Sequence, residues 1–200
     1  MISLFLLGGS TVAAGVPKVV EFARRATATP ATSGFCGSRH PVLADLAVRR
    51  LLLADQVAAA KFLTGQPVDD PVREREILDE VVAAARDIGL DPTVGMRFFR
   101  DQIEANKVVQ RGLHARWRAQ PSYGPHEQPD LARDVRPELD RITASMLREL
   151  LATTTGGGPD GVDRPTGSGP EALRHLDALH RGALAVALRS VPLPTTGRHG

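Results

Sequence analysis

Cationic, acidic and amide side chains recur along the chain at spacings that indicate a pocket for a small dianion. They are Arg50, Lys61, Arg73, Glu74, Asn106 and Gln110. Arg50 and Lys61 lie eleven residues apart, which on an α-helix is three turns with a small residual angle. Asn106 and Gln110 are four residues apart and also share a helix face. Fixed cations and hydrogen-bond donors of this kind suit electrostatic stabilisation of an anion.

Other kinds of site find little support in the sequence. The single cysteine, Cys36, excludes an intramolecular disulfide and a cysteine-based zinc site. His175 and His180 are five residues apart, which suits no helical metal-binding pair, so we expect both at the surface. No serine stands in a G-x-S-x-G context. We therefore expect no metal, no cofactor and no covalent nucleophile.

The composition favours one helical domain without nucleic-acid binding. Hydrophobic residues make up 42% of the 200 residues and aromatic residues only 4%, and abundant Ala, Leu and Val suit packed helices better than a β-sandwich. The net charge of +2 provides no broad basic field. Only the arginines around Trp117 support a nucleic-acid partner, and the balanced charge argues against one.

The N-terminal part has the features of an imperfect export signal. Residues 2–16 form an apolar run, too short for a membrane span and close to a signal-peptide core in length. No Lys or Arg precedes the run, and 26–28 has the small-x-small form of a cleavage site. We expect a signal and disordered linker over 1–37 and a secreted or periplasmic mature protein outside any membrane. A frayed N-terminal helix and a cytoplasmic protein are the alternatives.

Apolar residues with three-four spacing predict the elements that position these side chains. We expect an all-α bundle of about five helices with one long central helix, forming a domain over 38–192 and followed by a disordered tail over 193–200. The expected helices span 42–64, 71–89, 92–121, 131–151 and 171–190. Arg50, Lys61, Arg73, Asn106 and Gln110 should line one cleft between the first three.

The segments that carry these residues resemble the all-helical chorismate mutases of the AroQ type. The resemblance covers roughly residues 42–191, is specific over 50–78 and 98–113 and is weak after Pro121. The first of the specific stretches includes the motif Pro-Val-x-Asp-x-x-Arg-Glu-Arg. It implies the [3,3] rearrangement of chorismate to prephenate in phenylalanine and tyrosine biosynthesis, which needs no cofactor. Such a catalyst orients a flexible dicarboxylate and stabilises charge on its ether oxygen.

The resemblance also implies roles for single residues. Arg50 would hold a substrate carboxylate through its planar fork, and Arg73 would lie in the same carboxylate site. Lys61 and Gln110 would donate hydrogen bonds to the ether oxygen. Asn106 matches a hydroxyl-or-amide position.

Further roles fall on the second and fourth expected helices. Glu74 would accept a hydrogen bond from the ring hydroxyl, beside the backbone of Asp70. Arg136 would complete the carboxylate site, although the alignment there also admits Arg133 or Arg141.

Each assignment has a plainer alternative, and so does the function. The alternative is a surface arginine for Arg50 and a snorkelling lysine at a helix end for Lys61. For residues 73–76 it is a solvated charge run, and for the two amides a buried polar pair or surface residues. The length and the N-terminal segment resemble the secreted γ subclass, which implies a homodimer with a complete site in each protomer. A non-catalytic exported helical module that binds a ligand or partner is the alternative function.

Overall fold

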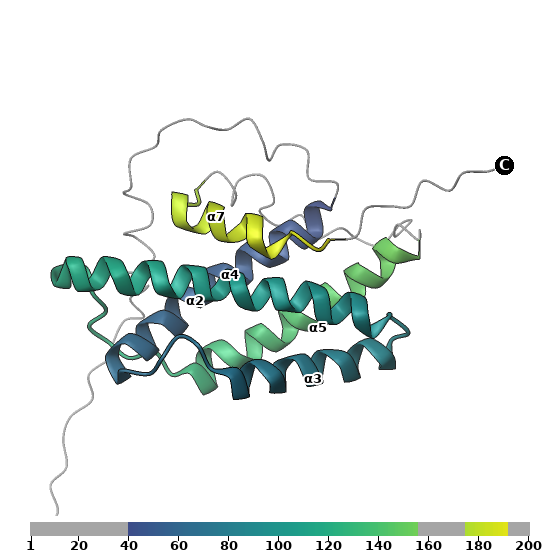
Figure 1. The fold of residues 1–200 in the computed structure, drawn as a ribbon, viewed down its shortest axis with the longest axis horizontal. Helices are drawn as coiled ribbons and strands as arrows, with labels where there is room; N and C mark the ends of the chain where they lie inside the picture. The colour runs from purple at the N-terminus through teal and green to yellow at the C-terminus, as the bar shows by residue number, and fades with distance from the viewer. Residues whose placement is uncertain (1–39, 156–174, 192–200) are drawn as a thin grey trace, which may run out of the picture.

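The computed structural model of the protein describes residues 40–155 and 175–191, and within these ranges it contains helices and no strands (Figure 1). The five α-helices of the described residues are α2 (Pro41–Thr64), α3 (Pro71–Asp87), α4 (Pro92–Ala119), α5 (Arg136–Thr154) and α7 (Ala178–Ala187). A short 3-10 helix (Pro121–Tyr123) and a π-helical turn (Leu131–Val135) connect α4 to α5. The all-α bundle with a long central helix is confirmed.

Local signals in the sequence determine where the first helices begin and end. Asp70 caps α3 by accepting a hydrogen bond from the Arg73 backbone N–H at 3.0 Å, and Asp91 caps α4 in the same manner. Gly65 ends α2 with a φ of 69°, a left-handed conformation that favours glycine. Asp70, and not the neighbouring Asp69, is therefore the N-cap of α3.

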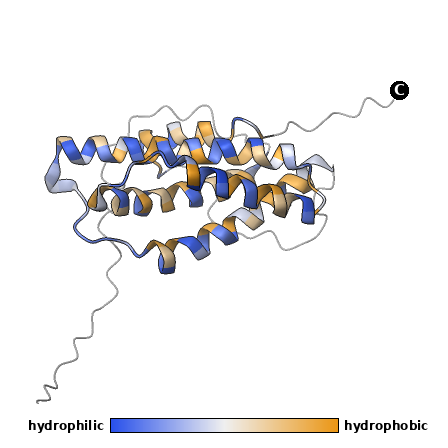
Figure 2. Cartoon of the chain, turned by 60° about the horizontal axis from the view of Figure 1, so that its bottom comes forward, coloured by the Kyte–Doolittle hydropathy of each residue, from blue (hydrophilic) through white to orange (hydrophobic). Residues whose placement is uncertain are grey.

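Helix α4 is the centre of the bundle. Its 28 residues contact α2, α3 and α7, and Figure 1 shows α3 and α7 on opposite sides of it. Phe98 and Phe99 of α4 are fully buried. Figure 2 shows hydrophobic and hydrophilic residues alternating along the helices, as expected when each helix buries one face.

Helix α7 packs on α4 by close approach and one buried hydrogen bond. A Cβ added at Gly112 would lie 2.5 Å from a Leu179 methyl carbon, so a side chain at this position would crowd the interface. The buried Gln102 side chain donates a hydrogen bond to the Ala187 carbonyl oxygen at 2.8 Å. Helices α4 and α7, which are remote in sequence, are therefore in contact near both ends of α7.

The structure corrects two expectations at the C-terminal end. Helix α7 begins at Ala178, because Asp177 caps it and residues 175–177 are not helical; residues 171–174 of the expected helix lie outside the described residues. His180, expected at the surface, is only 2% exposed. His175 is exposed, as expected.

His180 is buried because two aspartates bind its ring. Nε2 lies 2.9 Å from Asp55 Oδ1 of α2, and Nδ1 lies 2.7 Å from Asp177 Oδ1. Arg116 of α4 lies 3.5 Å from the other Asp177 oxygen. Burial alone would lower the pKa of His180, but the hydrogen bonds to Asp177 and Asp55 outweigh it and raise this pKa to about 9. The same contacts lower the pKa of Asp177 despite its burial.

Several expectations fall outside the described residues. They concern the export signal and linker over 1–37 and the tail over 193–200. In the described ranges, no helix has the length and apolar character needed to cross a membrane.

We predict that the stability of the protein falls as pH rises through the pKa of His180. The folded pKa of about 9 exceeds the unfolded value of about 6.5, so the stabilisation is complete below pH 6.5 and is lost as pH approaches and passes 9. The loss is on the order of 2 to 3 kcal/mol. Urea unfolding between about pH 6 and 9.5 measures it.

His180→Gln should remove this pH dependence and lower stability at pH 6, whereas His175→Gln should behave like the wild type. Parallel pH profiles for the wild type and His180→Gln would show that the imidazolium does not link α7 to α2.

Candidate active site

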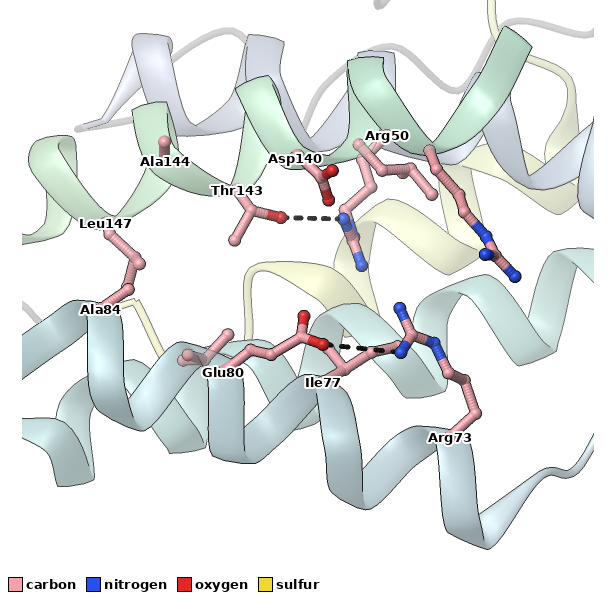
Figure 3. A pocket seen from close by; sticks show the side chains of 12 residues that line it. Arg50, Arg73, Ile77, Glu80, Ala84, Asp140, Thr143, Ala144 and Leu147 are labelled. Carbon is pink, nitrogen blue, oxygen red and sulfur yellow. Dashed lines mark hydrogen bonds and ion pairs between the residues drawn. The ribbon is translucent and has the colours of Figure 1, made fainter. Parts of the chain in front are cut away.

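A cavity of about 220 Å³ lies between α2, α3 and α5, and each of these helices places an arginine on its wall. The three arginines are Arg50, Arg73 and Arg136. Figure 3 shows Arg50 and Arg73 directed toward one another across the space. Glu80 and Asp140 also line the cavity, so its cations have acidic neighbours.

Arg50 is a buried cation with incomplete hydrogen bonding. It is 5% exposed, its Nη1 lies 3.4 Å from Thr143 Oγ1, and its guanidinium carbon lies 5.7 Å from the centre of the Phe99 ring. Its Nε is buried without a hydrogen-bond partner in the described part of the chain. Burial lowers the pKa of Arg50 to about 10, against the opposing charge of Asp140. The side chain is therefore cationic at neutral pH and retains capacity to bind an anion.

Arg73 is held along its own helix. Its Nη1 lies 2.9 Å from Glu76 Oε2 and 3.5 Å from Glu80 Oε1, and Figure 3 marks the contact with Glu80. The hydrogen bond to Glu76 raises the pKa of Arg73 despite partial burial. These carboxylates are well exposed, and exposed ion pairs of this kind contribute about 1 kcal/mol or less. An incoming carboxylate can therefore replace them.

The geometry distinguishes Arg136 from the two neighbouring arginines. Arg133 is paired with Asp134, and Arg141 is paired with Glu138, both at exposed positions. Arg136 begins α5 and lines the cavity. It is thus the arginine of this segment that shares the cavity with Arg50.

Lys61 lies at the end of α2, where its ammonium binds the following loop. Nζ donates hydrogen bonds to the carbonyl oxygens of Pro67 and Val68, each at 3.0 Å. An ammonium has three N–H donors, so one is left for another acceptor. Lys61 does not line the cavity of the arginines.

Asn106 and Gln110 lie on α4, outside the wall of that cavity. Gln110 is 6% exposed. The side-chain oxygens of both amides are buried without a hydrogen-bond partner among residues 40–155 and 175–191. Such atoms cost free energy unless a further group satisfies them, and the assignment of amide oxygen and nitrogen follows from the hydrogen-bond network.

Packing brings the Gln110 region of α4 against the Lys61 region of α2. His114, one turn after Gln110, lies with Nε2 2.8 Å from the Ala58 carbonyl oxygen, so this nitrogen carries the proton. Its ring also packs edge-on against Phe62, with 5.2 Å between ring centres. Burial lowers the pKa of His114, which favours this neutral donor. Lys61 and Gln110 therefore lie on packed segments of their helices.

Glu74 has a partner that the sequence did not indicate. Its two carboxylate oxygens lie 3.2 and 3.1 Å from Lys107 Nζ, and the Asp70 backbone N–H donates to it at 3.4 Å. The side chain of Asp70 caps α3, and its backbone N–H is the group that contacts Glu74. The structure thus separates the expected residues into an arginine cavity and a neighbouring group near the α2–α3 loop.

Four residues that lie beside the expected ones were not indicated by the sequence. They are Glu80, Lys107, Asp140 and Thr143. Three of them look like ordinary surface charges, since the sequence does not reveal which partner lies opposite. In the described ranges, no group of three or more His, Cys, Asp or Glu side chains is arranged to hold a metal ion.

Comparison with known proteins places the chain in a family. The family model for chorismate mutase type II matches residues 42–111. A secreted chorismate mutase of Mycobacterium tuberculosis is 32% identical over 155 residues, which cover 74% of this chain and 75% of that protein. This chain belongs to the chorismate mutase family.

Other chorismate mutases agree in sequence and fold. A secreted chorismate mutase of Mycolicibacterium smegmatis is 36% identical over 108 residues, which cover 54% of this chain and 59% of that relative. The crystal structure of a chorismate mutase from Burkholderia thailandensis has a TM-score of 0.63 and 35% identity, covering 76% of this chain and 98% of the other. The family match at 42–111 ends before Arg136.

We predict that Arg50→Met increases the free energy of unfolding by about 1 to 3 kcal/mol, because a buried charge with unfilled hydrogen bonds is replaced by an apolar side chain of similar length. Urea denaturation of the two proteins measures the change.

Arg49→Met is the matched control, since Arg49 is the exposed neighbour paired with Glu138 and should change stability by about 0.5 kcal/mol or less. A large loss of stability in Arg50→Met alone would identify Arg50 as a structural residue.

Proposed function

We propose that this chain catalyses the rearrangement of chorismate to prephenate. The observation that carries the proposal is Arg50, a buried guanidinium with unfilled donor capacity on a cavity that it shares with Arg73 and Arg136. A small substrate with two carboxylates matches the charge of such a site. Membership of the chorismate mutase family supports the same substrate.

The proposed reaction is intramolecular. One C–O bond of the ether bridge breaks while one C–C bond forms, and no proton or electron is exchanged with the protein. The site must therefore hold the substrate in its reactive shape and stabilise negative charge on the ether oxygen. Polar groups on rigid helices can do both without reorganising.

In this proposal the arginines orient the substrate. Arg50 supplies a guanidinium fork to one carboxylate, and Arg73 and Arg136 complete the carboxylate site. Arg73 exchanges its exposed contacts with Glu76 and Glu80 for a substrate carboxylate. Asp140 keeps the cavity from accumulating excess positive charge before substrate enters.

Lys61 and Gln110 stabilise the ether oxygen. Two N–H groups of Lys61 are held by loop carbonyl oxygens, so the third is available for the substrate. The buried amide oxygen of Gln110 has no partner among the residues that the structure describes, and the amide N–H group donates at any ordinary pH. Asn106 contributes a second amide one turn away, and Glu74 accepts from the ring hydroxyl beside the Asp70 backbone.

We also propose an extracellular or periplasmic location. The support is that the mycobacterial relatives are named secreted chorismate mutases, together with the apolar N-terminal run. The homodimer stays a prediction of the sequence. The alternative of a non-catalytic exported module gains no support from the comparisons.

The direct test is the loss of chorismate absorbance on addition of the purified protein with a metal chelator present. Lys61→Met should lower kcat/KM by about 100-fold or more, since removal of one preorganised donor costs about 3 kcal/mol. The exposed Arg49→Met variant should retain activity within about twofold. An inactive wild type, or a fully active Lys61→Met, would contradict the proposal.

A second prediction concerns the pH dependence that Gln110 determines. The wild-type kcat/KM should be flat across the neutral range, because an amide donor does not titrate there. In Gln110→Glu an ionised carboxylate would face the developing negative charge, so activity should rise as pH falls and the carboxyl group becomes a donor.

Steady-state kinetics between about pH 4 and 8 bracket the ordinary glutamate range. Gln120→Glu adds the same charge at the exposed end of α4 and should leave the profile flat. If the Gln110→Glu and wild-type profiles are parallel, Gln110 does not contact the ether oxygen.

A further inference from the structure

Lys107 is a nearly buried cation that the proposed mechanism does not use. Its side chain is 11% exposed, and its Nζ lies 2.6 Å from Glu104, 3.1 Å from Glu74 and 3.5 Å from Asp69. These three carboxylates match the three donors of an ammonium. Burial opposes the charge, but the hydrogen bonds to Glu104 and Glu74 outweigh it and raise the pKa of Lys107.

These contacts join α4 to the segment between α2 and α3. Glu104 and Lys107 both belong to α4, Glu74 lies in the first turn of α3, and Asp69 lies in the loop between α2 and α3. Arg111, one turn after Lys107 on α4, also binds Asp69. Two cations of α4, Lys107 and Arg111, therefore hold the side chain of Asp69 in this loop.

The same loop holds Lys61. The carbonyl oxygens of Pro67 and Val68 accept hydrogen bonds from the Lys61 ammonium at 3.0 Å, and Asp69 follows directly in the chain. A displacement of the loop would therefore move the carbonyl oxygens that direct the third Lys61 donor. Errors of about 1 Å in the placement of such a group can reduce rates by about 100-fold.

We propose that Lys107 is a positioning residue for the rearrangement: by holding Asp69 and Glu74 on α4, it fixes the loop that orients the Lys61 ammonium. This inference rests on the proposed function. Lys107 itself needs no contact with the substrate. Its effect passes through Asp69 to the loop carbonyl oxygens and through Glu74 to the start of α3.

The test replaces the charge of Lys107 while keeping its stem. Lys107→Met should lower kcat about tenfold or more, with a smaller change in KM, because the substrate-binding arginines stay in place. Lys107→Arg, which can bind Glu74 and Asp69, should recover a large part of kcat. Arg97→Met removes one positive charge from an exposed site on the same helix and should retain kcat within about twofold.

A double-mutant cycle locates the effect in the loop. Asp69→Asn should lower kcat in the wild type and have a smaller effect in the Lys107→Met background, since both substitutions release the contact between Lys107 and Asp69. The effect that remains in that background measures Arg111, which also binds Asp69. A kcat of Lys107→Met within twofold of the wild type would overturn the inference, as would equal losses in Lys107→Met and Lys107→Arg.

Hydrogen exchange separates this inference from the proposed function. The peptide covering residues 65–73 should exchange faster in Lys107→Met than in the wild type or Arg97→Met, whether or not the protein is active. An inactive wild type with this change in exchange would refute the mutase activity and leave the loop contact standing. Unchanged exchange would refute the role of Lys107.

Discussion

Helix α2 is buried around most of its circumference, and the other helices must provide partners for the charges it carries. Half of its 24 residues are buried, among them Arg50 and Asp55. These two lie five residues apart, or about 140° around the helix axis, and so face different neighbours. Arg50 faces Thr143 of α5 and Phe99 of α4, while Asp55 faces His180 of α7. A buried charge needs a polar partner, so both contacts constrain how the bundle assembles around α2.

The buried charges of His180, the partner of Asp55, and of Arg50 are compensated to different degrees. His180 has a carboxylate at each ring nitrogen, and Arg116 supports one of these carboxylates. Arg50 has one long hydrogen bond to Thr143 and a buried Nε without a partner among the described residues. A complete network links three helices and stabilises their packing. An incomplete one costs stability, and a substrate anion can offset that cost on binding.

Local chemistry explains which parts of the fold the sequence could predict. Pro71 and Pro92, each preceded by an aspartate, are local signals for the starts of α3 and α4, because a cap acts within a few residues of its own helix. The start of α7 was wrong, since apolar spacing continues through Leu173 and Leu176 while Asp177 caps the helix later. His180 was misplaced for a different reason. Its partner Asp55 lies 125 residues away in the sequence, so a local sequence pattern does not reveal the contact.

The same limit applies to the candidate site. Residue type, helical spacing and the resemblance to a family indicated Arg50 and Arg73, which share a cavity. The structure favours Arg136 over Arg133 and Arg141 at that cavity. Lys107 could not be found in this way, because a lysine between Glu104 and Arg111 resembles a solvated helix face.

The buried polar residues differ in how completely they are hydrogen-bonded. Buried side-chain oxygens of Asn106 and Gln110 and the Nε of Arg50 have no partner in the described part of the chain, whereas both nitrogens of His180 do. Gln102 is intermediate, since its amide nitrogen binds the Ala187 carbonyl oxygen and its own oxygen is unpaired. Unpaired atoms alone therefore do not define a site. They indicate one here because Arg50 also lines a cavity with two further arginines, so its unfilled donor capacity and the surrounding charge favour the same class of ligand.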